Sequence, residues 1–270
     1  MLKHLRRLGA LLGFIPAKAP AYPAIDLALP RGPRLHLVGS IHMGSPEMAP
    51  LPAALTERLS RADALIVEAD ITCAASPFEM TQDAVSLREV LNDDEWEQLC
   101  QRGAETGIAP ENIDGFAPWR AALMLQAQQA HQLGLRPDYG IDYQMLRQAH
   151  QQGLKIIELE GAATQMALLE NLPEGGIALL RDTLTHWHTN ARLLQTMLGW
   201  WLSPGAEQEK IALPATFSAG LYQILMEHRN QQWRDILCAL PQGNYVVAVG
   251  ALHLFGTDNL PELLLNQGAG

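Results

Sequence analysis

Four short apolar runs limit what this chain can fold into more than any other feature of its sequence. They cover residues 35–42, 64–68, 155–160 and 246–253, and each ends on a histidine or a glutamate. Such runs, separated by amphipathic helical stretches, are typical of the buried strands of an α/β sheet. Ligands of these sheets bind beyond the carboxyl ends of parallel strands. If the four runs are parallel neighbours, two imidazoles and two carboxylates meet in one crevice.

The segments around these runs predict a mixed sheet with a large helical insertion. Residues 24–29 and 34–39 are β-prone and are separated by Pro-Arg-Gly-Pro, which predicts an antiparallel hairpin. The spacing of apolar residues predicts helices over 51–62, several within 86–131, and others over 142–152, 162–172, 176–201, 217–240 and 260–266. No linker longer than about a dozen residues interrupts the chain, so we expect a single domain over residues 22–270.

The charge balance excludes one class of partner. The 270 residues include 19 Lys and Arg against 29 Asp and Glu, which gives a formal net charge of −10. Because a nucleic-acid-binding protein must neutralise phosphates, we expect no nucleic-acid partner. No segment approaches the roughly 18 apolar residues in a row that span a membrane. A globular protein that acts on a small molecule or a peptide fits these limits.

The first 21 residues differ from the rest of the chain. Basic residues within 1–7 precede a short apolar run over 8–15, which imitates a secretory signal only weakly because two glycines and Pro16 interrupt it. We predict a short amphipathic helix or a frayed terminus here. The expected location is cytoplasmic, with a periplasmic or secreted location as the alternative if the signal is real.

The cysteines agree with a reducing compartment. Cys73, Cys100 and Cys238 are far apart, odd in number and without CxxC spacing. They therefore predict neither a disulfide framework nor a thiolate metal site, and we expect structural thiols.

Two of the four runs end in the same pattern, Gly-x-x-His. Gly39 precedes His42, and Gly250 precedes His253, each directly after a predicted strand. Glycine allows a sharp turn at the strand end or the close approach of another segment. Two imidazoles with a carboxylate suit a borderline divalent metal ion that keeps open positions. Glu68 is the best-placed carboxylate, although it could equally cap the next helix or face water.

Other polar residues are second candidates for the same crevice. Glu160 stands at the end of its strand, and Glu158 could be the structural partner of a buried arginine. Asp142 is either a ligand or the N-cap of the following helix. Arg229 and Asn230 could bind a carboxylate, including Glu160, or form surface salt bridges.

Six segments together resemble the TraB/GumN family. They are residues 37–44, 66–70, 140–142, 158–161 with Gln165, 229–233 and 249–253. The resemblance implies an α/β fold like that of the Tiki-type metalloproteases, the erythromycin esterases and the ChaN-like proteins. It also implies a metal-dependent hydrolase, in one form a peptidase, that uses Mn or Co, with Zn as the alternative.

The resemblance also suggests roles for individual residues. His42, Glu68 and His253 match the positions that would hold the metal ion, and Glu68 or Glu160 would act as the catalytic proton shuttle. Gly39, Gly250, Asp142, Arg229 and Asn230 would support these residues or contact the substrate. The family commonly has threonine where this chain has Gly161, which puts only supporting contacts in doubt.

Two further hypotheses stay open beside the hydrolase. The first is a non-enzymatic module that binds haem or another planar ligand in the same crevice, which would then be lined by Trp119, Trp187, Trp200 and Trp201. The second is a structural or interaction protein in which the polar residues at the strand ends no longer have a catalytic or binding role. The oligomeric state is open as well.

Overall fold

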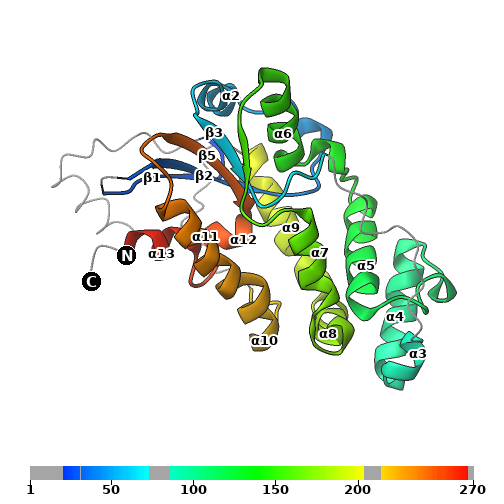
Figure 1. Cartoon of the computed structure of the whole chain (residues 1–270). Helices are drawn as coiled ribbons and strands as arrows, with labels where there is room; N and C mark the ends of the chain where they lie inside the picture. The colour runs from blue at the N-terminus through cyan, green and yellow to red at the C-terminus, as the bar shows by residue number, and fades with distance from the viewer. Residues whose placement is uncertain (1–20, 31, 73–85, 204–213, 267–270) are drawn as a thin grey trace.

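A five-stranded sheet forms the centre of the molecule (Figure 1). The computed structural model describes residues 21–30, 32–72, 86–203 and 214–266; nearly all of the basic N-terminal segment and Cys73 lie outside them. The strands are β1 (Ala24–Ala28), β2 (Arg34–Ser40), β3 (Ala64–Val67), β4 (Ile156–Glu158) and β5 (Asn244–Gly250). Their order is β1-β2-β5-β3-β4, with β1 antiparallel to β2 and all other pairs parallel. The predicted mixed α/β sheet is confirmed, and the four apolar runs are parallel neighbours.

Twelve α-helices and one π-helical turn are described around the sheet. Their bounds are α2 (Ala53–Ser60), α3 (Leu87–Val90), α4 (Asp93–Thr106), α5 (Pro118–Gln132), α6 (Ile141–Gln152), α7 (Ala162–Glu170), α8 (Ile177–Thr185), α9 (Trp187–Leu202), α10 (Ala219–Tyr222), the π turn η6 (Gln223–Glu227), α11 (His228–Cys238), α12 (Ala251–Phe255) and α13 (Leu260–Leu265). Helix α4 begins at a capping box, in which the Asn92 side chain accepts from the Glu95 amide. Helix α6 ends at Gly153, whose φ of 64° is the left-handed conformation that glycine adopts at low cost.

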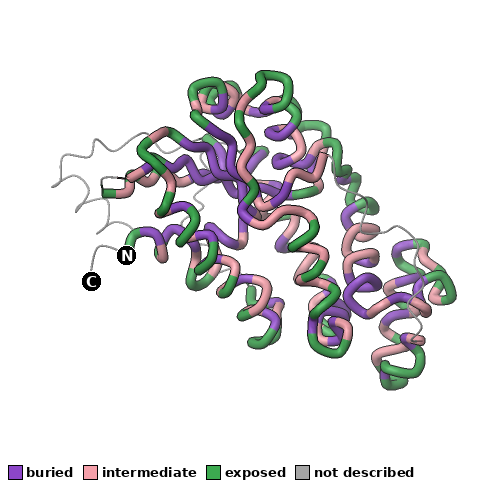
Figure 2. Tube along the Cα trace, in the orientation of Figure 1, coloured by how far each residue is buried: buried purple, intermediate pink, exposed green. Residues whose placement is uncertain are grey.

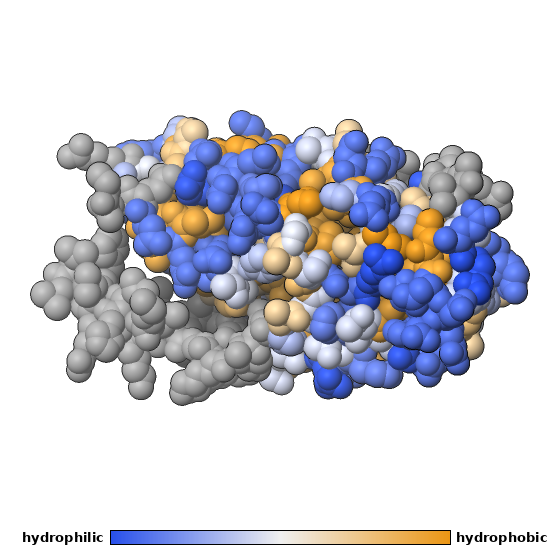
Figure 3. All heavy atoms as spheres, turned by 90° about the horizontal axis from the view of Figure 1, so that it is seen from below, coloured by the Kyte–Doolittle hydropathy of each residue, from blue (hydrophilic) through white to orange (hydrophobic). Residues whose placement is uncertain are grey.

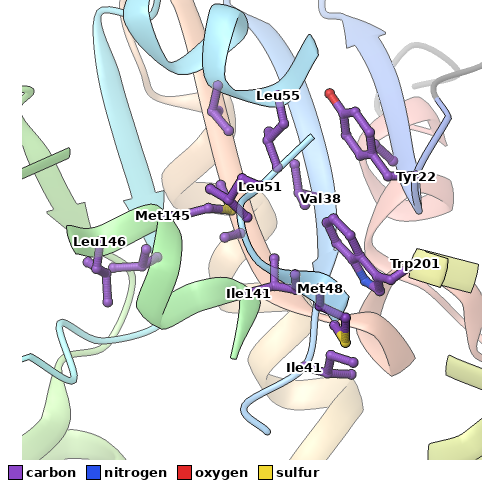
Figure 4. Packing of buried hydrophobic residues seen from close by; sticks show 14 of the residues in the cluster. Tyr22, Val38, Ile41, Met48, Leu51, Leu55, Ile141, Met145, Leu146 and Trp201 are labelled. Atoms are coloured by element: carbon purple, nitrogen blue, oxygen red, sulfur yellow. The ribbon is translucent and has the colours of Figure 1, made fainter. Parts of the chain in front are cut away.

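The two faces of the sheet are covered by different helices. Successive side chains of a strand point to opposite faces. Leu37 of β2 therefore packs in one cluster with Trp233 of α11, while Val38 packs on the other face with Leu55 of α2 and Met145 of α6 (Figure 4). Buried residues concentrate in the strands and along the inner sides of these helices (Figure 2). This layered core gives the strand ends a rigid base.

The predicted helical insertion forms a second apolar core at one end of the molecule (Figure 1). Helices α4, α5 and α8 contribute to it, and Trp119 and Trp187 are buried inside it. The long helix predicted over 176–201 is two helices, because His186, with φ of −100° and ψ of 19°, leaves the helical conformation between α8 and α9. The helix predicted over 217–240 is a continuous helical stretch from Ala219 to Cys238 that contains the π turn η6.

A chain of hydrogen bonds fastens the edge strand β1 to its neighbours. The Tyr22 hydroxyl donates to His36 Nε2 (2.9 Å), and His36 Nδ1 donates to Asp26 Oδ1 (2.8 Å). Arg58 of α2 donates to both carboxylate oxygens of Asp26, each at 2.9 Å. Burial alone would raise the pKa of Asp26, but the hydrogen bond from His36 and the charge of Arg58 hold that pKa below its ordinary value.

Exposed apolar residues are scattered over the described surface. Large apolar side chains are exposed on separate helices, at Val90, Leu133, Leu202, Ile236 and Leu265. The face drawn in Figure 3 accordingly mixes hydrophobic with hydrophilic residues. None of the helices in the described ranges combines the length and apolarity needed to cross a bilayer.

Candidate functional site

The carboxyl ends of β2, β5, β3 and β4 lie along one edge of the sheet and bring the predicted site residues together. In the register of the sheet, Ser40 is opposite Gly250, and Val67 pairs with both Ala248 and Glu158. His42, His253, Glu68 and Glu160 each follow one of these strand ends. The sequence prediction that four polar side chains converge on one place is therefore correct.

The loop that carries His42 is held by the segment before α6. The Gly44 amide donates to the Arg136 carbonyl (3.0 Å), and the Arg136 amide donates back to the Gly44 carbonyl (2.8 Å). The Ile141 amide donates to the Ile41 carbonyl (3.0 Å), and both isoleucines are buried in the cluster of Figure 4. A side chain at Gly140 would place its Cβ 2.4 Å from the carbonyl oxygen of His42. Only glycine allows the two segments to approach this closely.

This arrangement makes a pair of His42 and Asp142. His42 Nδ1 donates a hydrogen bond to the Asp142 carboxylate, which is 9% exposed, whereas the imidazole is 67% exposed. The negative charge of Asp142, aided by that of Glu68, raises the pKa of His42 to about 9. Among the described residues, none forms a hydrogen bond with His42 Nε2. The imidazole is therefore oriented through one nitrogen and free to act through the other.

Glu68 is buried and ionised. Its Oε1 accepts from the Gly250 amide (2.7 Å), and its Oε2 accepts from Arg229 Nη2 (2.6 Å) and from Gln165 Nε2 of α7 (3.1 Å). Burial alone would raise the pKa of Glu68, but the charge of Arg229, aided by that of His42, lowers it to about 2. Oε1 has a single donor and can therefore accept one more hydrogen bond.

Arg229 joins Glu68 to Glu160. Its Nε donates to Glu160 Oε1 (2.8 Å), its Nη2 to Glu160 Oε2 (3.0 Å), and its Nη1 to the carbonyl of Leu225 in the π turn η6 (3.2 Å). The guanidinium carbon lies 4.6 Å from the centre of the Trp233 ring, and Trp233 Nε1 also donates to Glu160 Oε1 (2.9 Å). The arginine is thus fixed on all sides by groups that match its charge and shape.

His253 is held behind Glu68 on α12, a short helix that the sequence prediction missed. Its Nδ1 donates to Asn230 Oδ1 (2.7 Å), and its Nε2 lies 3.4 Å from Arg229 Nη1. Burial lowers the pKa of His253 to about 4, so this imidazole is neutral. Helix α12 packs closely on β2. A Cβ at Gly39 would lie only 2.9 Å from Phe255 Cε2.

A small hollow opens beside His42 and Glu68. It has room for about one water molecule. Its wall consists of Ser40, His42, Val67, Glu68, Ala69, Ile71, Asp142, Gln165 and Ala248. His253, Arg229 and Glu160 do not line the hollow. The site therefore has an open part, around His42 and Asp142, and a buried part behind Glu68.

Comparison with known proteins places the chain in a family. The model of the TraB/PrgY/gumN family matches residues 30–269. The chain belongs to this family. It is 53% identical over 243 residues to the uncharacterized protein YbaP of Escherichia coli (strain K12), covering 90% of this chain and 92% of that protein. The match to YbaP of Shigella flexneri has the same identity and coverage. No solved structure matches the chain at a significant level.

The three metal ligands implied by the family resemblance, His42, Glu68 and His253, are not arranged around a single ion position in this structure. Within the described residues, no three His, Cys, Asp or Glu side chains form a group that could hold a metal ion. Arg229 contacts two of the three expected ligands: its Nη2 is 2.6 Å from Glu68 Oε2, and its Nη1 is 3.4 Å from His253 Nε2. The donor types suit a divalent ion, but a guanidinium lies between two of the three expected ligands.

Three acidic residues have partners that differ in part from those predicted. Asp142 is not the N-cap of α6, since Gly140 has that position and Asp142 instead accepts from His42. Glu158 is not the partner of a buried arginine; it accepts from the Asp70 amide (2.7 Å), whereas Glu160 pairs with Arg229. The prediction that Arg229 binds the Glu160 carboxylate is confirmed.

Other contacts have no clear signal in the sequence. The close approach at Gly140 depends on segments that are about 100 residues apart in the sequence. The sequence of the π turn that supplies the Leu225 carbonyl has the pattern of an ordinary α-helix. The four tryptophans expected around a planar ligand do not line the hollow. Trp119 and Trp187 lie in the helical core, Trp201 stacks on Tyr22, and Trp200 packs on Phe255.

Proposed function

We propose that this chain is a hydrolase that uses water to cleave a carbonyl compound, a peptide or an ester, in the hollow beside His42. The main support for this proposal is the orientation of His42. His42 is oriented through Nδ1 by the Asp142 carboxylate, and its Nε2 is free beside a space that accommodates about one water molecule. An imidazole held in this way by a buried carboxylate is the arrangement of a general base.

The chain's own residues supply the steps of this reaction. His42 Nε2 in its neutral form takes a proton from the attacking water and later returns it to the leaving group. Asp142 stabilises the imidazolium that forms, since its carboxylate accepts from Nδ1. Glu68 lines the same hollow, and its Oε1 can accept a hydrogen bond from the water. Val67, Ala69 and Ala248 form an apolar wall that limits access of bulk water.

The metal-dependent form of the proposal follows from the family resemblance. Mn or Co, with Zn as the alternative, would be held by His42, Glu68 and His253, and would polarise the carbonyl and acidify water. Because Arg229 now lies between Glu68 and His253, this form needs the arginine to move. No step of the reaction described above depends on such an ion.

A substrate screen tests the proposal. Full-length wild type, His42→Ala and His131→Ala would be incubated with fluorogenic peptide and ester libraries, both after chelation and with added Mn²⁺, Co²⁺ or Zn²⁺. His131 is an exposed histidine at the end of α5 and serves as the matched control. We expect the wild type and His131→Ala to cleave the same substrates, and His42→Ala to lose at least about 100-fold in rate. Equal cleavage by His42→Ala, or no cleavage by any of the three under any condition, would refute the proposal.

A further inference from the structure

The buried part of the site contains more negative than positive charge. The side chains of Glu68 and Glu160 are only 11% and 6% exposed. Arg229 is the cation that faces both Glu68 and Glu160. Buried carboxylates are costly unless a cation pairs with them. Some positive charge must therefore reside at this place in the folded protein.

Arg229 supplies this positive charge, and each of its N–H groups has a partner. Nε and Nη2 bind the two carboxylates at 2.6–3.0 Å, and Nη1 binds the Leu225 carbonyl at 3.2 Å. The second proton of Nη1 is directed at His253 Nε2, at 3.4 Å. All five N–H groups of a guanidinium are thus accounted for. The π turn that offers the Leu225 carbonyl and the ring of Trp233 hold the group in place.

A metal ion bound to Glu68 and His253 would need lone pairs that Arg229 already uses. His253 Nε2 has one lone pair in the plane of the ring, and Arg229 Nη1 lies 3.4 Å from it. Glu68 Oε2 accepts from both Arg229 Nη2 (2.6 Å) and Gln165 Nε2 (3.1 Å). The guanidinium and an ion bound to both of these atoms therefore exclude each other.

We propose that Arg229 is the resident cation of this site. It contacts Glu68, Glu160 and His253, and so engages two of the three side chains, His42, Glu68 and His253, that the family resemblance gives to a divalent metal ion. This proposal concerns the same site as the proposed function, and it rests on that function only for the identity of the reaction. In this account Arg229 is a positioning residue, because it fixes the Glu68 carboxylate at the wall of the hollow. One consequence is specific: without the guanidinium, two carboxylates and one imidazole face a single space, which is a donor set for a divalent ion.

Metal content is the test, and it needs no substrate. Untagged wild type, Arg229→Gln and Arg234→Gln would be stripped with chelator, incubated with Mn²⁺, Co²⁺ or Zn²⁺, desalted and analysed by elemental mass spectrometry. Arg234 lies on the same helix but pairs with Asp235 at the surface, so it is the matched control. Thermal unfolding with and without each ion gives a second readout.

We expect the wild type and Arg234→Gln to retain less than about a tenth of an ion per chain and to unfold at the same temperature with or without metal. Arg229→Gln should gain close to one ion per chain, and its Tm should rise by several degrees when the ion is added. Arg229→Lys, which keeps the charge, should behave like the wild type.

Two results would overturn the inference. One is a wild type that retains about one ion per chain after desalting. The other is an Arg229→Gln variant that gains no more metal than Arg234→Gln. If Arg229→Gln does not fold, the wild type alone decides, because retained metal contradicts the inference and its absence supports it. Failure of the hydrolase proposal would appear in the substrate screen and leaves these readouts unchanged.

Discussion

The two histidines of the Gly-x-x-His patterns occupy opposite electrostatic surroundings. His42 is exposed beside Asp142, and its pKa is raised to about 9; His253 is buried beside Arg229, and its pKa is lowered to about 4. The pattern therefore predicts that each imidazole follows a strand, but not which one titrates. That difference depends on the charge of Asp142 beside His42 and on the burial of His253, which other parts of the chain produce.

The Asp142→Asn variant tests the role of His42 as a base. A raised pKa means that neutral His42 accumulates only as the pH rises, so kcat/KM of the wild type should increase up to about pH 9. Removing the Asp142 charge lets the pKa fall toward its ordinary value near 6.5. The inflection of the pH–rate profile should move to lower pH, and the maximal rate should fall by about 10²–10⁴-fold. An inflection that stays in place in Asp142→Asn would contradict this role.

At the scale of elements, the packing of α12 on β2 explains why glycine stands at position 39. The sequence prediction offered a sharp turn or a close approach as reasons, and the structure has the close approach: a Cβ there would lie 2.9 Å from Phe255 Cε2 and 3.3 Å from Ala251 Cα. At Gly250 a Cβ would have ordinary contacts of 3.5 Å, and the residue contributes its amide to Glu68 instead. The same residue type serves two purposes in the two copies of the pattern.

A pair of glycine variants tests this packing. Gly39→Ala should lower the free energy of unfolding by about 1–3 kcal/mol, because the Phe255 ring must shift. Gly199→Ala, within α9 at a position where a Cβ would enter open space, should raise it by about 0.5–1 kcal/mol. Urea unfolding measures both changes. A Gly39→Ala variant as stable as the wild type would mean that α12 does not pack this closely on β2.

At the scale of the whole molecule, sequence patterns predict the layers better than the contacts between them. The alternation of Leu37 and Val38 onto opposite faces follows from local periodicity. The parallel pairing of the four runs is a condition that the sequence alone does not establish, and the structure fulfils it. The pairing of His42 with Asp142 and of Glu68 with Arg229 joins residues 100 and 161 positions apart. No local pattern contains such pairs, so the candidate site could be located from the sequence, but the division into an open and a buried part could not.

The stability of the molecule in acid should depend on Asp26. Since its pKa is lowered in the folded protein, Asp26 stabilises the fold above its unfolded pKa, near 3.9, and this contribution is lost as the pH falls from there through the lower folded pKa. Asp26→Asn should therefore cost roughly 1 kcal/mol at pH 7, and progressively less below about pH 4. Thermal unfolding across pH measures this difference. Asp138→Asn, at an exposed position, serves as control. If Asp26→Asn lowers the free energy of unfolding by the same amount at pH 3 and pH 7, the ionisation of Asp26 does not contribute to stability.

In the proposed reaction, His42, held by Asp142, activates water beside Glu68 while Arg229 supplies the positive charge. The most direct measurement is the hydrolysis rate of chelator-treated wild type beside chelator-treated His42→Ala, on the best substrate from the screen. We expect the wild type to keep its full rate without metal and His42→Ala to lose at least about 100-fold in rate. A wild type that is inactive after chelation and regains its rate with Mn²⁺, or a His42→Ala variant that stays fully active, would contradict this expectation.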